Sequence, residues 1–244
     1  MSSLADSAIQ SFPVAASDCM LSGSLEAQGF LRLPGVLGAV DVAAMAAHVD
    51  ACDGDDAGTR NLLQHAWCRA LVAPLRLRLR DLGVLAEDAL AVQCTLFRKS
   101  QSLNWKVALH QDLSIPVAEK VANEALSGWS HKEGSHFVQP PTALLERLTV
   151  VRIHLDPCTD SDGPLRVVPG SHRVGKLNAQ RASALREERG ETQCTARPGD
   201  LLIMRPLLLH ASSKASRPQG RRRVLHFLFG PSDPGHGLRW SLAI

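Results

Sequence analysis

The sequence predicts a mainly β fold of the double-stranded β-helix (jelly-roll) class with flanking helices. After Gly83 the chain consists of short apolar or alternating runs that end at Gly, Pro, Asp or Ser, which is typical of a sandwich or barrel. Among such folds, the jelly roll is favoured by a metal-ligand pattern described below. The expected strands are residues 91–97, 106–109, 148–155, 165–168, 201–204, 207–210 and 224–229.

Length and composition are those of one globular domain. Of the 244 residues, 45% are hydrophobic and 21% charged, close to the globular average. No apolar run approaches the roughly 18 residues of a membrane helix. The net charge is +3, and basic residues are dispersed apart from Arg221–Arg223, so no nucleic-acid stripe is evident. We expect an anionic small molecule as partner, and neither nucleic acid nor membrane; the oligomeric state stays open.

The six cysteines are dispersed and form no Cys-x-x-Cys pair, which argues against a thiolate zinc site. We expect reduced, mostly buried thiols and a cytoplasmic location. The first twenty residues lack the features of a secretory signal, and residues 1–27 are expected to be a loosely ordered leader.

Helices are expected mainly before Gly83. A short strand over 30–33 precedes a helix over about 39–52, where apolar residues recur at helical spacing. Residues 53–58 are expected to be a solvated loop, with a calcium site as a remote alternative. Leu and Ala indicate helix over 62–82, with a break expected at Pro74. We expect these helices to pack on one outer face of the jelly roll.

His110, Asp112 and His210 are the candidate metal ligands. Side chains alternate along a strand, so His110 and Asp112 point to the same face. A second imidazole from another strand would complete a two-His-one-carboxylate triad, which leaves positions open on Fe(II). His210, at the end of an apolar run, is the candidate. The alternative is that both histidines are hydrogen-bonded core residues and that Asp112 caps a turn.

The order of these motifs resembles the iron(II)/2-oxoglutarate dioxygenases, and the surrounding sequence resembles their phytanoyl-CoA dioxygenase-like branch. The resemblance covers roughly residues 28–230. It rests on Gln28–Gly35, Asn104–Asp112, the Pro-Gly-Ser-His segment within Gly163–Arg173, and His210 followed by arginines. It implies a single jelly-roll oxygenase domain over 28–230, followed by a C-terminal tail over 231–244. It further implies Fe(II) on His110, Asp112 and His210, with 2-oxoglutarate and O2 as cosubstrates.

The resemblance also implies an arginine for the far carboxylate of 2-oxoglutarate. Arg221, Arg222 and Arg223 all stand at a suitable distance after His210. Strand alternation favours Arg222, because Val224 and His226 then share its face. The family's usual spacing favours Arg221 slightly, unless residues 216–219 form an insertion. Lys99 is a further candidate, because its ammonium could meet a carboxylate.

Residues 113–147 contain several Pro and Gly and are expected to form a lid over the metal, or else a surface loop. As a lid, this segment would present Trp129, His131, Lys132 and His136 to the substrate. Arg152 and His154 share one face of a strand and could line a wet cavity or face solvent. The remaining substrate candidates are Trp105, Lys106, Arg166 and Ser171, although Ser171 could instead satisfy a turn.

The function predicted from the resemblance is hydroxylation, or another oxidation, of a small molecule with release of succinate and CO2. The retained carboxylate of Asp112 argues against halogenation, since halogenating relatives carry a small residue there. Two alternatives remain: a cupin-like metalloenzyme that does not use 2-oxoglutarate, and a non-catalytic jelly-roll binding protein. The sequence does not identify the prime substrate, and the short chain argues against coenzyme A.

Overall fold

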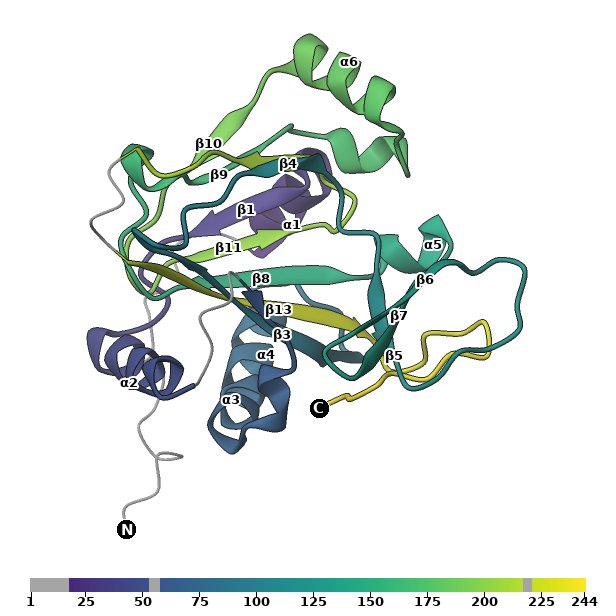
Figure 1. The fold of residues 1–244 in the computed structure, drawn as a ribbon, viewed down its shortest axis with the longest axis horizontal. Helices are drawn as coiled ribbons and strands as arrows, with labels where there is room; N and C mark the ends of the chain where they lie inside the picture. Colours follow the sequence, from purple (N-terminus) through teal and green to yellow (C-terminus); the bar gives the residue numbers. More distant parts are fainter. Residues whose placement is uncertain (1–17, 53–57, 217–220) are drawn as a thin grey trace.

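A computed structural model describes residues 18–52, 58–216 and 221–244 of the chain. Most of its strands belong to two antiparallel sheets that face each other (Figure 1). The large sheet has the order β1-β11-β8-β13-β3-β2. These strands are β1 (Phe30–Leu33), β11 (Leu201–Met204), β8 (Thr149–His154), β13 (Arg222–Pro231), β3 (Ala89–Lys99) and β2 (Gly58–Thr59).

The small sheet has the order β10-β9-β12-β4. Its strands are β10 (Thr192–Cys194), β9 (Leu165–Val167), β12 (His210–Ser212) and β4 (Val107–His110). Apolar side chains from the inner faces of both sheets pack together, including Val150 and Met204 from the large sheet and Val167 from the small one. Two facing antiparallel sheets of this kind form the jelly roll that the sequence predicts.

The outer face of the large sheet is covered by α2 (Ala39–Asp50), α3 (Ala66–Ala70) and α4 (Val72–Asp81) (Figure 1). Val49 and Leu79 from these helices pack with Ile153 and Phe227 from the sheet in one buried cluster. A helical break falls near the predicted place. It lies at Leu71 rather than at Pro74, because the third residue of a helix has no intrahelical partner for its N–H, so proline is tolerated there.

The predicted helices do pack on one outer face, but the chain has a further helix that the sequence did not predict. Helix α6 (Ala179–Arg189) lies on the opposite side of the molecule, over the small sheet (Figure 1). Its Ala182 and Leu185 are buried against Leu209 and the half-buried Leu109. The helix presents only this short apolar stripe among charged residues, and the hydrophobic pattern did not reveal it.

Part of the expected leader is also ordered. Helix α1 (Asp18–Gln28) occupies residues that the sequence assigned to a loose segment, because Leu25 is fully buried in the main core. Residues 1–17 lie outside the described part of the chain, as do residues 53–57 of the expected solvated loop and 217–219 of the possible insertion.

The expected lid segment contains a small sheet of its own. Strands β5 (Ile115–Val117), β7 (Ser135–Gln139) and β6 (Ser127–Lys132) pair in the order β5-β7-β6 and are followed by α5 (Thr142–Glu146). Residues 231–244 lie beside this sheet, where Val117 pairs with Trp240 (Figure 1). The segment is therefore not a surface loop, since it forms a sheet in which Ile115 and Val138 are fully buried.

One predicted strand is displaced. Residues 207–209 lie outside any strand, and β12 begins at His210 instead of the predicted strand ending there. Leu207 and Leu208 are buried in the core although they are not in a strand. Their hydrophobicity therefore indicated burial but did not distinguish a strand from a buried connecting segment. The remaining short elements are the 3-10 helices η1 (Leu62–Gln64), η2 (Asp160–Asp162) and η3 (Ser171–Val174). Among the described residues, no helix is long and apolar enough to cross a membrane.

Candidate metal centre

Strands β4 and β12 bring the three candidate ligands together. His110 and His210 are directly paired across the small sheet, and their ring centroids lie 4.2 Å apart. Asp112 follows β4, and its backbone N–H donates to the carbonyl of Pro206 at 2.9 Å. One ligand atom from each of the three residues lies within 4.8 Å of the others, and no other such group of His, Cys, Asp or Glu occurs in the described ranges.

Both imidazoles present the same nitrogen to the carboxylate. The Nδ1 atoms of His110 and His210 lie 2.9 Å from the carbonyl oxygens of Ala108 and Leu208, so each Nδ1 carries the proton and donates. The Nε2 atoms then carry lone pairs, and they lie 3.5 and 3.7 Å from Oδ1 of Asp112. Three electron-pair donors converge with no proton between them, which is the arrangement that a cation would neutralise.

The backbone around the ligands is fixed from behind. The Gln111 side chain points away from the ligands, as alternation predicts, and its amide donates to the carbonyls of Leu207 and Gly175 at 2.6 and 2.8 Å. The Ser171 hydroxyl accepts a hydrogen bond from the N–H of Leu209 at 2.8 Å. Because Leu209 precedes His210, the Pro-Gly-Ser-His segment supports the ligand strand from outside the cavity.

The ionisation states suit metal binding at neutral pH. Burial alone would raise the pKa of Asp112, but the neighbouring imidazoles of His210 and His110 outweigh it and hold that pKa well below its usual range. Burial lowers the pKa of His210 to about 4, with the charge of Asp112 acting in the opposite direction. For His110 burial also lowers the pKa, yet contact with Asp112 leaves it raised. Asp112 is thus ionised and His210 is neutral.

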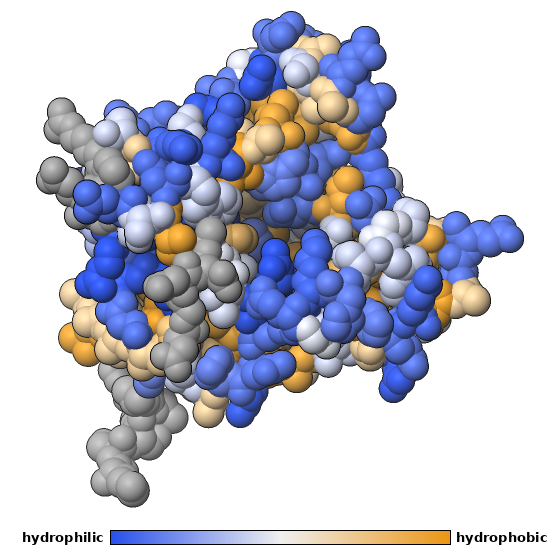
Figure 2. Space-filling view, in the orientation of Figure 1, coloured by the Kyte–Doolittle hydropathy of each residue, from blue (hydrophilic) through white to orange (hydrophobic). Residues whose placement is uncertain are grey.

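A cavity of about 370 Å³ opens beside the three ligands. The space-filling view shows a hollow near the middle of this face, with hydrophilic residues around it (Figure 2). The cavity lies between the two sheets and reaches the β5-β7-β6 sheet. The residues that line it include Phe97, Trp105, Arg152, Arg222 and His226 on one side of the ligands, and Gln93, Ile115, Phe137, Leu148, Val150 and Leu228 on the other.

The three consecutive arginines have three different environments. Arg222 is buried and lines the cavity, where its Nη1 donates to the carbonyl of Gly163 at 2.6 Å. Arg223 points to the other face of β13 and pairs with Asp156 and Asp50, both at 2.8 Å. Arg221 is exposed. Of the three arginines, Arg222 therefore lines the cavity, on the face of β13 to which strand alternation assigned it.

Lys99 is directly beside Arg222 in the large sheet. Its ammonium donates to the Ser212 hydroxyl at 3.1 Å and to the carbonyl of Ser213. Burial, together with the charge of Arg222, lowers the pKa of Lys99 to about 8, so it remains mostly protonated at neutral pH. No carboxylate forms an ion pair with either of these two cations in the described part of the chain.

Phytanoyl-CoA dioxygenase (PhyH) is the family whose model matches this chain, over residues 25–224. The chain belongs to this family. Membership makes it an enzyme of the Fe(II)/2-oxoglutarate oxygenase superfamily, with Fe(II), 2-oxoglutarate and O2 as its cofactors. No match was found among curated proteins.

Solved structures with the same fold agree with this membership. The 2-oxoglutarate-dependent epimerase SnoN of nogalamycin biosynthesis has 16% identity and a TM-score of 0.64, and the alignment covers 91% of this chain and 87% of SnoN. HygX from Streptomyces hygroscopicus, with nickel and 2-oxoglutarate bound, has 19% identity, a TM-score of 0.62 and 87% coverage of each chain. EctD from S. alaskensis has 18% identity and a TM-score of 0.65, with 96% of this chain and 86% of EctD covered.

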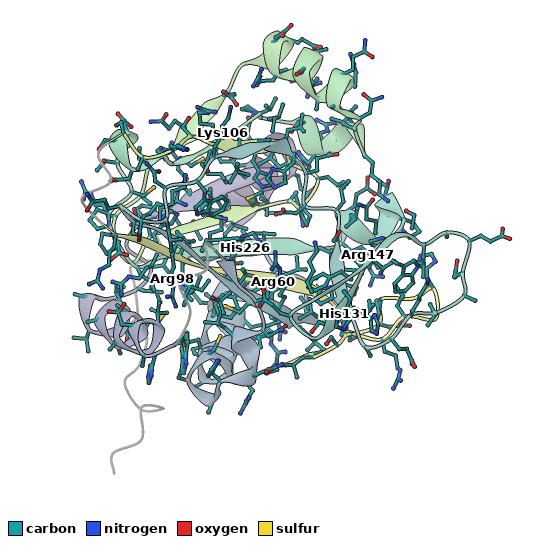
Figure 3. The ribbon with its side chains drawn as sticks, viewed as in Figure 1. Arg60, Arg98, Lys106, His131, Arg147 and His226 are labelled. Atoms are coloured by element: carbon teal, nitrogen blue, oxygen red, sulfur yellow. The ribbon has the colours of Figure 1, made fainter. Side chains whose placement is uncertain are left out.

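Of the predicted substrate residues, Trp105 and Arg152 line the cavity. Most of the others do not reach it. Lys106 is exposed, and Arg166 turns outward to Glu191 and the Ser213 hydroxyl. Figure 3 shows His131 to the side, on the three-stranded sheet, where its ring lies 5.0 Å from that of His136. The other candidates that do not line the cavity are Trp129, which packs on the core, and the buried residues His154 and Ser171.

His226 is a cavity residue that the site predictions for this oxygenase omitted. It lies near the middle of the large sheet (Figure 3), with Nε2 3.9 Å from Oδ2 of Asp112. Arg152 Nη1 lies 2.9 Å from its Nδ1. A guanidinium can only donate, so Nδ1 accepts and the ring proton stays on Nε2, facing Asp112. Its position four residues after Arg222, and so on the same face of the strand, was the available signal.

Proposed function

We propose that this protein is an Fe(II)- and 2-oxoglutarate-dependent oxygenase that hydroxylates a small molecule, releasing succinate and CO2. The observation that carries this proposal is the placement of His110, Asp112 and His210 in the same cavity as the buried Arg222, which forms no ion pair with any described residue. The first three supply a metal site, and the arginine supplies a separate anion site within the same space.

The residues fit Fe(II). Two imidazole nitrogens and one carboxylate oxygen form the facial set typical of non-haem iron oxygenases, with the remaining positions open towards the cavity. In this site the metal would be held by Nε2 of His110, Nε2 of His210 and Oδ1 of Asp112. Once bound, the iron and 2-oxoglutarate supply the oxidising chemistry, while the chain supplies ligand geometry and orientation.

Arg222 would bind the distal carboxylate of 2-oxoglutarate. A planar guanidinium pairs with a carboxylate through two parallel hydrogen bonds, and Nε of Arg222 is buried with no partner in the described part of the chain. Lys99 adds a second positive charge beside it. Arg221 and Arg223 are unsuited to this role, because one is exposed and the other is engaged by Asp50 and Asp156.

His226 would orient the carboxylate of Asp112. Oδ2 of Asp112 is buried and has no hydrogen-bond partner among the described residues, and the Nε2 proton of His226 is the donor that faces it. With Oδ2 held in this way, Asp112 would bind the metal through Oδ1 alone. The open coordination positions would then stay free for 2-oxoglutarate and O2.

Hydroxylation is the outcome we favour because Asp112 retains the carboxylate that halogenating relatives lack. The structures with the same fold include an epimerase and a carbocyclase, so another oxidative outcome at the same metal is the second candidate. Free, largely buried thiols at Cys68, Cys94 and Cys158 suit a reducing compartment, and we propose the cytoplasm.

The test is anaerobic addition of Fe(II) and then of 2-oxoglutarate to the whole protein. We expect a visible charge-transfer band from the chelate, followed by succinate formation when O2 is admitted. His110→Ala, Asp112→Ala and His210→Ala should each remove both signals. Metal binding without the band would favour a metalloenzyme that does not use 2-oxoglutarate, and no metal binding would favour a binding protein. Full turnover by any of these variants would refute the assignment.

A further inference from the structure

We propose that the prime substrate is a small organic acid with an apolar body, whose anionic group binds at the cavity rim beside Lys132 and Arg60. This inference rests on the proposed function, because it assigns the Arg222 end of the cavity to 2-oxoglutarate. The argument concerns the other end, which is formed with the β5-β7-β6 sheet.

Strand register separates the two ends. Arg222 pairs with Lys99, whereas Leu228 pairs with Gln93 on β3 and with Val150 on β8. Arg222 and Leu228 both face the cavity, but six residues of extended strand, about 20 Å, separate their backbones. His226 lies between them and faces Asp112. A molecule on the Leu228 side therefore approaches the metal from the side opposite to Arg222.

The Leu228 end is apolar. Ile115, Leu148 and Val150 are fully buried and line it, and Phe137 closes it from β7. Gln93 and Thr95 are the polar exceptions on the sheet, and their side chains hydrogen-bond to each other at 3.2 Å. This lining offers an apolar substrate body van der Waals contacts and few hydrogen-bonding groups, and a polar body placed here would lose its hydrogen bonds to water.

The rim of this end is cationic. Lys132 and Arg60 line the cavity, and no carboxylate other than Asp112 does so among the described residues. The Lys132 ammonium lies over the ring of Phe137, 5.6 Å from its centroid. Arg60 is fixed by Glu133, which accepts from its guanidinium and from its backbone N–H, both at 2.7 Å. Two cations and one carboxylate leave one positive charge at the rim.

The interior of the cavity also carries positive charge. Arg152, Arg222 and Lys99 are buried, and none of them forms an ion pair within the described ranges. Bound Fe(II) would add two positive charges, against three negative charges from Asp112 and 2-oxoglutarate. The occupied cavity would therefore remain positive, which favours an anionic substrate and disfavours an amine.

The available volume limits the size of this acid. About 370 Å³ is near the lower end of the range of about 300–1,000 Å³ found for small-molecule pockets. Part of that volume belongs to 2-oxoglutarate. The space left suits a compact acid and is too small for an entire acyl-coenzyme A.

The experiment compares acids with their own amides on the anaerobic Fe(II)·2-oxoglutarate complex of the full chain. The probes are octanoate, 4-phenylbutyrate and cyclohexanecarboxylate, each paired with its amide, and octylamine. Binding is followed by calorimetry and by the shift of the visible band. We expect at least one acid to bind about tenfold more tightly than its amide, and octylamine to bind more weakly than either.

Lys132→Glu should abolish this preference for the acid. Lys120→Glu is the matched control, because its ammonium also lies over an aromatic ring, that of Trp129, but does not line the cavity. The proposal is overturned if no acid in the panel binds, if the amides bind as tightly, or if Lys132→Glu keeps the preference. A missing band would instead indicate failure of the proposed oxygenase function, since none of these variants touches the metal ligands.

Discussion

Strand β13 has two faces that differ in function: side chains on one face line the cavity, and side chains on the other stabilise the fold. The inward face carries Arg222 and His226, which line the cavity; among the described residues, the only carboxylate at ion-pair distance from either is Asp112, beside His226. The outward face carries Arg223, whose guanidinium is paired with Asp50 and Asp156, followed by the fully buried Leu225 and Phe227. The guanidinium of Arg223 is thus fully engaged by carboxylates, whereas Nε of Arg222 has no hydrogen-bond partner among the described residues.

The largest expected effect is on the inward face. Arg222→Ala should weaken 2-oxoglutarate binding by about a thousandfold, on the order of 4 kcal/mol. The distal carboxylate of 2-oxoglutarate would then be buried without the guanidinium that pairs with it. Calorimetric titration of the metal-loaded protein measures this loss. The unfolding free energy without ligand should change little. An equal loss in Arg221→Ala, with Arg222→Ala unaffected, would contradict the distinction between the faces.

Arg223→Met should instead lower the stability of the fold and leave 2-oxoglutarate binding intact. Removing one partner of a largely buried ion pair leaves an uncompensated charge on Asp156, so the free energy of unfolding should fall by about 3 kcal/mol. Urea denaturation measures it, and 2-oxoglutarate affinity should be retained. Arg221→Met is the control: Arg221 is exposed, and its removal should change stability by less than about 0.5 kcal/mol.

His154 extends the inward face onto β8, where it pairs with Val224. Burial, with Arg152 nearby, lowers its pKa to about 3. Because this pKa is depressed on folding, its contribution to stability is present above the unfolded value near 6.5 and is lost as pH falls. Between pH 7.5 and 5 the loss is about 2 kcal/mol. In His154→Phe the unfolding free energy should therefore fall by about 2 kcal/mol less over this pH range than in the wild type. If the two proteins lose the same free energy between pH 7.5 and 5, the prediction is wrong.

The smallest effect concerns His226. His226→Leu removes the donor that faces Asp112 Oδ2, and metal affinity should fall by about tenfold, as for other residues that support metal ligands. Titration with Mn(II) in place of Fe(II) measures it without turnover. His226→Gln keeps an amide donor and should retain part of the affinity. Unchanged Mn(II) affinity in the leucine variant would show that Asp112 needs no such support.

Local pattern was sufficient for features governed by strand geometry. The choice of Arg222 over Arg223 follows from the period of two along β13, which depends only on backbone stereochemistry. The same rule grouped His110 with Asp112, although Asp112 lies beyond the end of β4. The same rule placed Gln111 on the supporting side. Where the pattern was short or the residues were polar, as in α6, it did not identify the element.

Other features required the folded chain. For Ser171 the sequence left open a place near substrate and a role in satisfying backbone groups; its hydroxyl accepts from the N–H of Leu209, outside the cavity. The expected lid became a sheet whose Phe137 and Lys132 face the cavity, while Trp129 and His136 do not. A strand's alternation says which residues share a face, yet it cannot say which face is turned inward until neighbouring strands pair.

The sequence by itself determined the ligand types, their order and the alternation that groups Arg222 with His226, because these depend on neighbouring residues. Only the tertiary structure decided that His210 meets His110, that His226 faces Asp112 and that Lys132 and Arg60 share one rim. The pairs His210–His110 and Arg60–Glu133 join residues far apart in the chain. Such contacts arise from sheet pairing and core packing of the whole domain, which no local pattern encodes.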